Sequence, residues 1–436
     1  MSREKRFNIR EWSWILYDWA NSVYATNISA AIFPILYSQI AGKGTTGDLL
    51  YGYAVSLANL LVAALAPYLG SIADFKGMKK KLWTIFLFLG VIFTAVMGLV
   101  GSWQLMLIGL VISRIGFSGC NLFYDSFLTD VTTPERMDRV SAWGYAMGYI
   151  GGSTIPFLIS IAIMLMMNQS ELSMRIAVLI VPVWWLVFSI PFMKNVHQTC
   201  YVETPPAELG KAAWENTRAM LGRIVKDKAV LFFLLGYFFY IDGVDTIINM
   251  ATKYGDTLGL GSIGMILALL VTQLVAMPCS ILFGNLSKKK GALNLITFAV
   301  LLYAFITVIG FVMGFIVDFN DTLGLARERA VGISQMLFWV LATLVGTVQG
   351  GIQALSRSYF GRLIPPERSG EYYGFMDIIG KFACVMGPAL YELFYGLTGK
   401  ACFGILSLIL LFAIGYTFLR IGRPYFHKAQ HEATEG

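Results

Sequence analysis

The sequence predicts an all-α integral membrane protein with twelve membrane-spanning helices and both chain termini in the cytoplasm. Three observations support this prediction. Hydrophobic residues make up 57% of the 436 residues and charged residues only 14%, whereas soluble proteins carry about 25% charged residues. The apolar residues form twelve segments, each long enough for the roughly 20 residues that a span requires. The loops between them are alternately rich and poor in lysine and arginine, which orients a membrane protein with its basic loops inside.

The basic loops alternate strictly with loops that contain few lysine and arginine residues. Most of the 33 lysine and arginine residues fall in the segments 3–10, 76–81, 136–139, 211–228, 288–290, 357–368 and 420–428. An even number of spans places both termini on the basic, cytoplasmic side. The net charge of +7 therefore reflects orientation and contact with anionic headgroups, and it gives no indication of nucleic-acid binding.

The twelve predicted spans leave little sequence for soluble domains. We expect them at 12–40, 50–73, 82–101, 103–129, 139–166, 173–193, 229–255, 263–286, 292–317, 331–361, 369–396 and 401–421. The first is too long for the apolar part of a cleavable signal peptide, so we expect it to remain as a helix. Within the longest polar stretch, 194–228, residues 207–228 have the pattern of an amphipathic helix on the cytoplasmic face. A regulatory domain is the alternative.

The two halves of the chain repeat each other. A shift of 232 residues places Ser126, Pro134, Glu135, Arg136, Gly148 and Pro156 on Ser358, Pro366, Glu367, Arg368, Gly380 and Pro388. Six spans separate the partners, so corresponding helices run in the same direction, as in transporters built from two parallel halves. We therefore predict an N-terminal six-helix lobe at 1–193, a cytoplasmic linker at 194–228 and a C-terminal six-helix lobe at 229–436.

The turn between the second and third spans contains Gly70, Asp74 and Gly77, followed by three lysines at 79–81. This turn resembles the signature loop of the major facilitator superfamily, and the resemblance implies the fold of that superfamily. It also implies that the aspartate and the glycines let two helix ends pack closely while the lysines stay in the cytoplasm. Gly70, Asp74 and Gly77 are therefore expected to act in the conformational switch and not to contact a solute.

Three further motifs narrow the resemblance. They are YDWANS at 17–22, FYDSFL at 123–128 and GGIQALSRS at 350–358, and they resemble the vacuole-effluxer-like branch of the superfamily, whose best-known members export amino acids. The resemblance implies a secondary transporter that works by alternating access, in the plasma membrane of a bacterial cell. It also implies that the first, fourth, seventh and tenth spans line the solute cavity.

Ionisable side chains at membrane depth are costly unless they are paired or hydrated, so each is a functional candidate. Eight residues are of this kind: Asp18, Arg114, Asp125, Asp242, Asp245, Arg357, Asp377 and Lys381. Arg114 lies near mid-membrane, in a setting that resembles the fourth-span arginine motif of proton-coupled relatives. Since arginine keeps its proton, we expect it to anchor a solute anion or to act on a nearby carboxylate. A structural ion pair within its own lobe is the alternative.

Asp242 and Asp245 lie three residues apart and therefore on one face of the seventh span. All three histidines fall in cytoplasmic segments, so a proton carrier within the membrane must be a carboxylate. We expect Asp242 or Asp245 to carry a coupling proton or to bind a cation. The alternative is that one of them caps a helix that is broken at Gly243.

Solute binding is expected at polar and aromatic side chains of the predicted cavity-lining spans and of the eleventh span. These residues are Asp18, Asn21, Arg114, Tyr124, Tyr240, Gln353 and Lys381. Carboxylates and aromatic rings suit an ammonium group, and the basic residues suit a carboxylate, so a small zwitterion such as an amino acid is the expected solute. Lys381 is alternatively paired with Asp377, four residues earlier. A lipid or amphiphile flippase on the same fold is the alternative function.

The repeat also places Asp125 on Arg357, each nine residues before a proline. We predict that these two residues form a salt bridge between the lobes that closes a cytoplasmic gate. The alternative is that each pairs within its own lobe.

Several protein classes are not supported by the sequence. A phosphate-binding loop of the GxxxxGK[ST] type is missing, so direct use of ATP is not expected, and the five cysteines lack metal-ligand spacing. We expect no enzymatic activity, no cofactor, no metal and no nucleic-acid partner. The expected partners are a small-molecule solute, protons and the lipid bilayer, and the chain is expected to work as a monomer.

Overall fold

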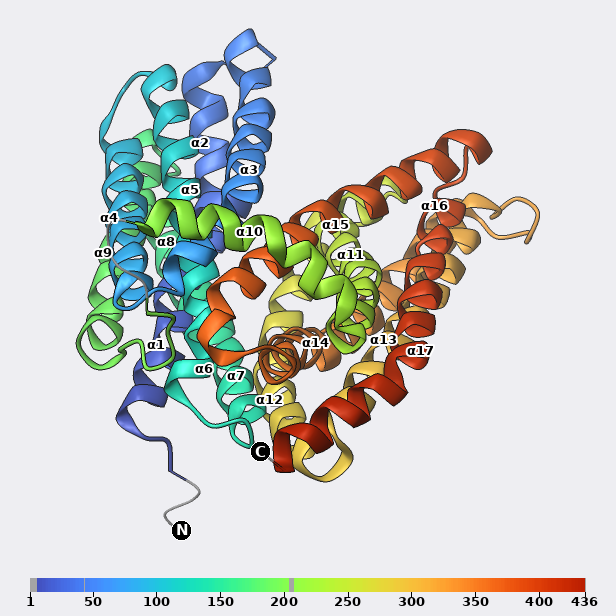
Figure 1. The fold of residues 1–436 in the computed structure, drawn as a ribbon. Helices are drawn as coiled ribbons and strands as arrows, with labels where there is room; N and C mark the ends of the chain where they lie inside the picture. The colour runs from blue at the N-terminus through green and yellow to red at the C-terminus, as the bar shows by residue number, and fades with distance from the viewer. Residues whose placement is uncertain (1–5, 43, 204–207, 436) are drawn as a thin grey trace. The chain divides into compact units, whose positions relative to one another are not determined.

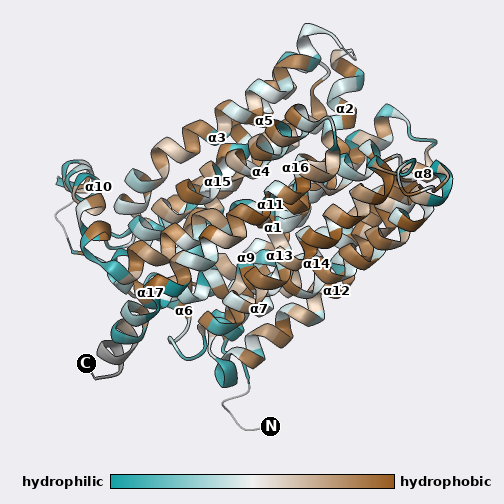
Figure 2. Cartoon of the chain, turned by 90° about the vertical axis from the view of Figure 1, so that its right-hand side faces the viewer, coloured by the Kyte–Doolittle hydropathy of each residue, from teal (hydrophilic) through white to brown (hydrophobic). Residues whose placement is uncertain are grey.

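The computed structural model describes residues 6–42, 44–203 and 208–435, and these residues are almost entirely helical (Figure 1). Eleven helical segments in this part are long and apolar enough to cross a membrane. Hydrophobic residues run along the helices, and hydrophilic residues gather at α10, near α6 and toward the end of α17 (Figure 2). The prediction of an all-helical, multi-pass membrane protein is confirmed; the count of twelve spans and the side of the termini stay predictions.

The helices before the linker match the predicted spans to within a few residues. They are α1 (Ile9–Val23), η2 (Tyr24–Ala31), α2 (Ile32–Ala41), α3 (Thr46–Ala73), α4 (Met78–Leu99), α5 (Trp103–Ser126), α6 (Leu128–Val131), α7 (Met137–Met147), η3 (Gly148–Thr154), α8 (Ile155–Met166) and α9 (Glu171–Asn195). The segments η2 and η3 are π-helical and interrupt the first and fifth predicted spans. Such wider turns are rare and are often found at functional sites.

The remaining helices follow the predictions closely except at the last span, which was expected at 401–421 and continues as α17 to Glu435. They are α10 (Leu209–Lys226), α11 (Lys228–Thr257), α12 (Ser262–Lys290), α13 (Ala292–Asp318), α14 (Arg327–Leu363), η5 (Pro366–Arg368), α15 (Ser369–Thr398), α16 (Ala401–Ser407) and α17 (Ile409–Glu435). The amphipathic helix expected in the linker is α10. Its residues Ala213, Met220 and Ile224 are buried, whereas Trp214 and Leu221 are exposed.

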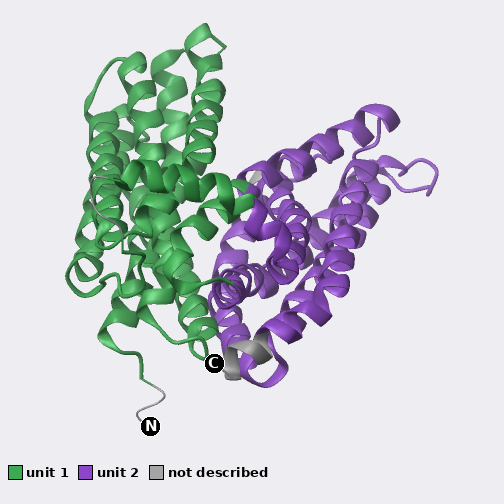
Figure 3. Ribbon diagram, viewed as in Figure 1, with its two compact units in different colours: residues 1–221, 364–378 green, residues 222–363, 379–436 purple. Residues whose placement is uncertain are grey.

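The chain divides into two compact units (Figure 3). Unit 1 comprises Met1–Leu221 and Ile364–Ile378, and unit 2 comprises Gly222–Leu363 and Ile379–Gly436. The first turns of α15 therefore belong to unit 1 and the rest of this helix to unit 2. The predicted lobes at 1–193 and 229–436 stay a prediction.

Four glycines pack α7 and η3 against α1 in unit 1. A Cβ atom at Gly151 would lie 1.8 Å from the ring of Trp19, and one at Gly152 would lie 2.4 Å from the Cβ of Ser22. Gly144 and Gly148 face the same helix. Glycines at such positions let helix backbones approach closely within a membrane.

Candidate functional site

Arg114 lies on α5 and is held by neutral side chains. Its Nε donates to Oδ1 of Asn59 on α3 at 3.0 Å, and its Nη1 donates to Oγ of Ser29 in η2 at 3.3 Å. Among the described residues, no carboxylate lies within 4.0 Å of this half-buried guanidinium. The structural ion pair that the sequence left open is therefore absent, and the positive charge is available to an anion.

The π-helical segment η2 positions one of the two partners of Arg114. Ser29 lies on this segment, and Asn27, which is fully buried, anchors it by donating to Oγ of Ser160 at 2.9 Å. Just before, the ring of Tyr24 stacks on Phe117 of α5 with centroids 4.5 Å apart. The sequence did not reveal Ser29 or Asn59 as partners, because their approach depends on how three helices pack.

Asp18, Asn21 and Tyr124 meet where α1 packs on α5. The Tyr124 hydroxyl donates to Oδ2 of Asp18 at 2.7 Å, and Asn21 donates its side-chain amide to Asn121. The structure therefore brings together three of the predicted solute-binding residues. Tyr124 is 1% exposed and stacks on Trp14, so its ring is a packing element.

Asp18 and Arg114 lie at different levels of unit 1. Tyr124, the partner of Asp18, follows Arg114 by ten residues on α5, which corresponds to about 15 Å between their Cα atoms along the helix at 1.5 Å per residue. Binding of one solute by both residues stays a prediction.

Asp242 and Asp245 lie on α11 and face α15 within unit 2. Asp242 is fully buried. Its Oδ1 accepts a hydrogen bond from the backbone N–H of Gly387 at 2.9 Å, whereas its Oδ2 has no hydrogen-bond partner among the described residues. Asp245 accepts a weak hydrogen bond from the Cys384 thiol at 3.5 Å. No lysine or arginine of the described chain lies within 4.0 Å of either carboxylate. Two carboxylates without a neighbouring cation thus lie within one span.

The alternative role proposed for one of these carboxylates is not observed. The helix α11 is continuous from Lys228 to Thr257, so neither aspartate caps a break at Gly243. A Cβ atom at Gly243 would lie 2.6 Å from the ring of Phe412. Gly243 is therefore a close-packing position.

The remaining predicted solute-binding residues are distributed over three helices. Tyr240 is fully buried between α11 and α14, where its hydroxyl and the Ser356 hydroxyl lie 2.7 Å apart, so it is a packing residue in this structure. Gln353 is half-buried on α14, and Lys381 lies on α15. Solute contact by Gln353 and Lys381 stays a prediction.

The signature turn after α3 holds the start of α15. Asp74 is 3% exposed, and its two carboxylate oxygens accept the backbone N–H groups of Gly370 at 2.7 Å and Glu371 at 2.9 Å. These N–H groups belong to the first turn of a helix, where they lack helical partners and attract negative charge. A Cβ atom at Gly70 would lie 2.1 Å from the carbonyl oxygen of Gly370. Asp74 and Gly70 thus hold the end of α3 close to the start of α15, and their role in a conformational switch stays a prediction.

Gly77 and Lys79 complete this turn in different ways. Gly77 has a φ of 74°, a left-handed conformation that glycine adopts readily. Lys79 is fully buried within the protein, and the cytoplasmic position expected for the three lysines stays a prediction. The Nζ of Lys79 lies 2.7 Å from Oδ2 of Asp130 and 2.8 Å from Oγ of Ser369, so these groups replace water.

Asp130 also fixes the chain that follows α9. Its Oδ1 accepts the backbone N–H groups of Thr199 at 2.6 Å and Cys200 at 2.8 Å. The backbone of Val202 pairs with that of Phe75 in the signature turn. The sequence contained no signal for Asp130, because its partners come from two distant segments, at Lys79 and at Thr199–Cys200.

The predicted gate residues lie in different units. Asp125 is half-buried on α5 in unit 1, and Arg357 is 4% exposed on α14 in unit 2. The salt bridge between them stays a prediction.

Long helices that enclose ionisable side chains at membrane depth are typical of membrane transporters, and comparison with solved structures agrees with this class. The chain is similar to the crystal structure of the major facilitator superfamily transporter FucP in the outward conformation, with a TM-score of 0.69 and 13% identity, covering 95% of this chain and 98% of that one. It is also similar to the proton:xylose symporter XylE bound to 6-bromo-6-deoxy-D-glucose, with a TM-score of 0.67, 11% identity and coverage of 94% and 93%. These likenesses show the major facilitator fold.

Comparison with known protein sequences identifies the family to which the chain belongs. It is 41% identical over 427 residues to a Bacillus subtilis (strain 168) protein described as the MFS-type transporter YxiO, covering 95% of both chains. It is 27% identical over 281 residues to autophagy-related protein 22-2 of Aspergillus clavatus, covering 60% of this chain and 44% of that protein. The family model described as "Vacuole effluxer Atg22 like" matches residues 45–433. The chain belongs to this family of MFS-type transporters, which confirms the resemblance seen in its motifs.

Proposed function

We propose that the protein is a proton-coupled secondary transporter of a small zwitterionic solute, such as an amino acid, and that it works by alternating access in the plasma membrane. The observation that carries this proposal is Arg114, a half-buried cation within a span whose hydrogen-bond partners in the described part of the chain are the neutral side chains of Asn59 and Ser29. An isolated charge at this depth is costly unless water or a ligand compensates it. A solute carboxylate would supply both the charge and planar acceptors for the guanidinium fork.

Asp242 and Asp245 are the proposed proton carriers. A buried carboxylate without a cation is costly while it is charged and less so once it is protonated. The free Oδ2 of the fully buried Asp242 is a position at which a proton can be carried. Asp18 accepts a hydrogen bond from Tyr124, and binding of the solute amine by Asp18 remains part of the proposal.

The test is transport by the purified protein in proteoliposomes, with radiolabelled amino acids supplied in small pools. We expect counterflow exchange of at least one pool and faster uptake when a pH gradient is imposed. The double variant Asp242→Asn/Asp245→Asn should lose gradient-driven accumulation and keep part of the exchange. Asp256→Asn, at the exposed end of α11, is the matched control and should behave as the wild type.

Two outcomes would contradict the proposal in different ways. Full gradient-driven accumulation by the double variant would remove Asp242 and Asp245 as proton carriers. Movement of a fluorescent lipid analogue without uptake of any amino acid would favour the flippase alternative, which no observation supports at present.

A further inference from the structure

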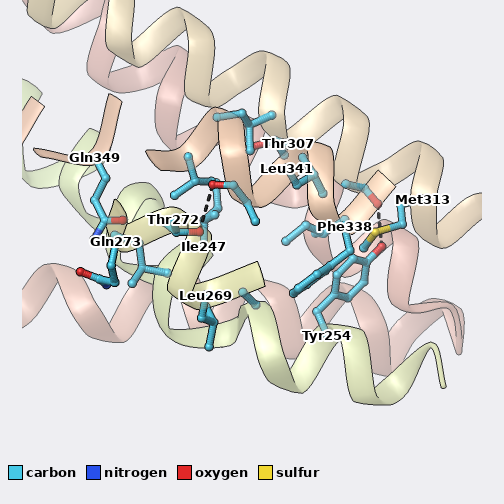
Figure 4. A pocket seen from close by; sticks show the side chains of 17 residues that line it. Ile247, Tyr254, Leu269, Thr272, Gln273, Thr307, Met313, Phe338, Leu341 and Gln349 are labelled. Atoms are coloured by element: carbon cyan, nitrogen blue, oxygen red, sulfur yellow. Dashed lines mark hydrogen bonds between the residues drawn. The ribbon is translucent and has the colours of Figure 1, made fainter. Parts of the chain in front are cut away.

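Unit 2 contains a second candidate binding site, separate from the residues discussed above. A cavity of about 730 Å³, including its open side, lies among α11, α12, α13 and α14 (Figure 4). The lining includes neither Asp242 nor Asp245, and none of the lining residues is charged. This cavity is therefore distinct from the site of the two aspartates.

Two glutamines give the cavity one polar end. Gln273 of α12 and Gln349 of α14 lie close together at this end, with Phe338, Tyr254 and Met313 at the other (Figure 4). Gln349 is 7% exposed, and Oε1 of Gln273 is buried without a hydrogen-bond partner among the described residues. A buried amide oxygen without a partner is unfavourable by about 1–3 kcal/mol. This end of the cavity is therefore suited to a ligand that donates a hydrogen bond.

The other polar groups of the lining are already satisfied within the protein. The Thr272 hydroxyl donates to the carbonyl of Ala342 at 3.0 Å, and the Thr307 hydroxyl donates to that of Tyr303 at 2.9 Å. The Tyr254 hydroxyl donates to the carbonyl of Gly310 at 2.8 Å. The body of the cavity consequently presents alkyl and aromatic surface.

The cavity is closed on one side and open on another. A Cβ atom at Gly346 of α14 would lie 2.8 Å from the carbonyl oxygen of Thr272 on α12, so these two helices are in close contact there. Among the lining residues, Leu269 of α12 is 36% exposed, whereas Phe338 of α14 is 5% exposed. A ligand would therefore enter past Leu269 and reach inward toward Phe338.

We propose that this cavity binds an uncharged single-chain amphiphile. Its hydroxyl or amide head hydrogen-bonds to Gln273 and Gln349, and its chain lies along Ile247, Leu341 and Phe338. A charged head is disfavoured, because burial of an unpaired charge is costly and the lining offers no opposite charge. An elongated molecule fits better than a compact one, because the two glutamines lie at one end and the remaining polar groups of the lining are hydrogen-bonded within the protein.

The experiment uses the full-length protein in nanodiscs and a monoacylglycerol whose chain carries a diazirine. Photolabelling is followed by peptide mapping, with unlabelled monolaurin as the competitor. We expect saturable labelling of residues 247–254 and 269–273. Monolaurin should compete at least about tenfold better than lauric acid or dodecyltrimethylammonium, which have the same chain length and opposite charges.

Three variants make the test specific to the cavity. Gln273→Leu should weaken competition by monolaurin about tenfold, and Ala342→Phe, which fills the cavity, should abolish labelling. Gln335→Leu changes a glutamine of α14 that is outside the lining and should label as the wild type. Thermal unfolding measured without the probe shows whether Ala342→Phe is folded. If it is not, the result for Gln273→Leu alone decides whether the cavity binds the amphiphile.

The proposal is overturned if labelling cannot be saturated, as for annular lipid or for a cavity that holds only water. It is equally overturned if Gln273→Leu and Gln335→Leu bind alike, or if the charged amphiphiles compete as well as monolaurin. These readouts measure binding and not transport. Amphiphile binding can therefore be disproved while the proposed amino-acid transport is confirmed, and amino-acid transport can be disproved while amphiphile binding is confirmed.

Discussion

The Nζ of Lys79 lies 2.7 Å from Oδ2 of Asp130, and neither side chain is exposed. This ion pair lies beside the contact between Asp74 and the first turn of α15, since Lys79 also donates to Oγ of Ser369. A buried ion pair contributes little net stability, but loss of one partner leaves a buried charge without compensation. The pair therefore makes this region sensitive to single substitutions.

We predict that Lys79→Met destabilises the protein by about 3–5 kcal/mol, because Asp130 remains buried and charged. The double variant Lys79→Met/Asp130→Asn should be milder, since no buried charge remains and the Asn side-chain oxygen still accepts the N–H groups of Thr199 and Cys200. Thermal unfolding of the detergent-purified protein measures both. Lys76→Met, which breaks an exposed pair with Glu203, should leave unfolding unchanged. A double variant as unstable as Lys79→Met would argue against the uncompensated charge as the cause.

The stability of the Asp74 contact should depend on pH. Burial raises the pKa of Asp74 to about 8 from its ordinary 3.8. The charge of Lys79 and the N–H groups of Glu371 and Gly370 lower this pKa, whereas the Glu371 carboxylate raises it further. The pKa of Asp74 is higher in the folded protein than in the unfolded chain, so protonated Asp74 stabilises the fold. This contribution to the free energy of unfolding is complete below about pH 4 and is lost as the pH rises to about 8. The decrease is at most about 1.4 kcal/mol per pH unit.

The comparison of wild type with Asp74→Asn isolates this effect. Unfolding temperatures measured from pH 5 to 9 should fall in the wild type relative to the variant up to about pH 8 and then run parallel. Parallel behaviour over the whole range would mean that Asp74 does not titrate there.

The sequence predicted the helices well because their signals are local. The ninth span was expected at 292–317 and is observed as Ala292–Asp318, since an apolar run between polar turns is sufficient to locate it. The turn that contains Asp74 could be located for a similar reason, because it carries a recognisable motif with two glycines.

The partners of the charged residues could not be predicted in this way. Arg114 meets Asn59 and Ser29, and Lys79 meets Asp130, through contacts between distant segments. A single sequence without a partner motif does not show which neutral side chain faces a charge. The π-helical segment η2, on which the position of Ser29 depends, also left no periodic signal.

Gly387 should be required for the arrangement around Asp242. A Cβ atom there would lie 2.0 Å from Oγ1 of Thr246 and 2.8 Å from Oδ1 of Asp242. We expect Gly387→Ala to destabilise the protein by about 1–3 kcal/mol through overpacking and to slow gradient-driven transport. Gly396→Ala is the control on the same helix, because no atom lies within 4 Å of its added Cβ. Equal stability and transport in the two variants would contradict the role of Gly387.

Arg114→Lys should weaken solute binding although it preserves the charge. The guanidinium donates from Nε to Asn59 and from Nη1 to Ser29, which leaves Nη2 and the remaining N–H of Nη1 for a carboxylate. Lysine offers one compact ammonium group and cannot keep both neutral contacts while binding an anion.

For Arg114→Lys we expect the half-saturating solute concentration to rise at least about tenfold, equivalent to about 1.4 kcal/mol, as measured by counterflow in proteoliposomes. Arg218→Lys is the control, because Arg218 is exposed on α10 and should tolerate lysine. Wild-type affinity in Arg114→Lys would show that only the charge matters, and the proposed bidentate binding of the solute carboxylate would then be wrong.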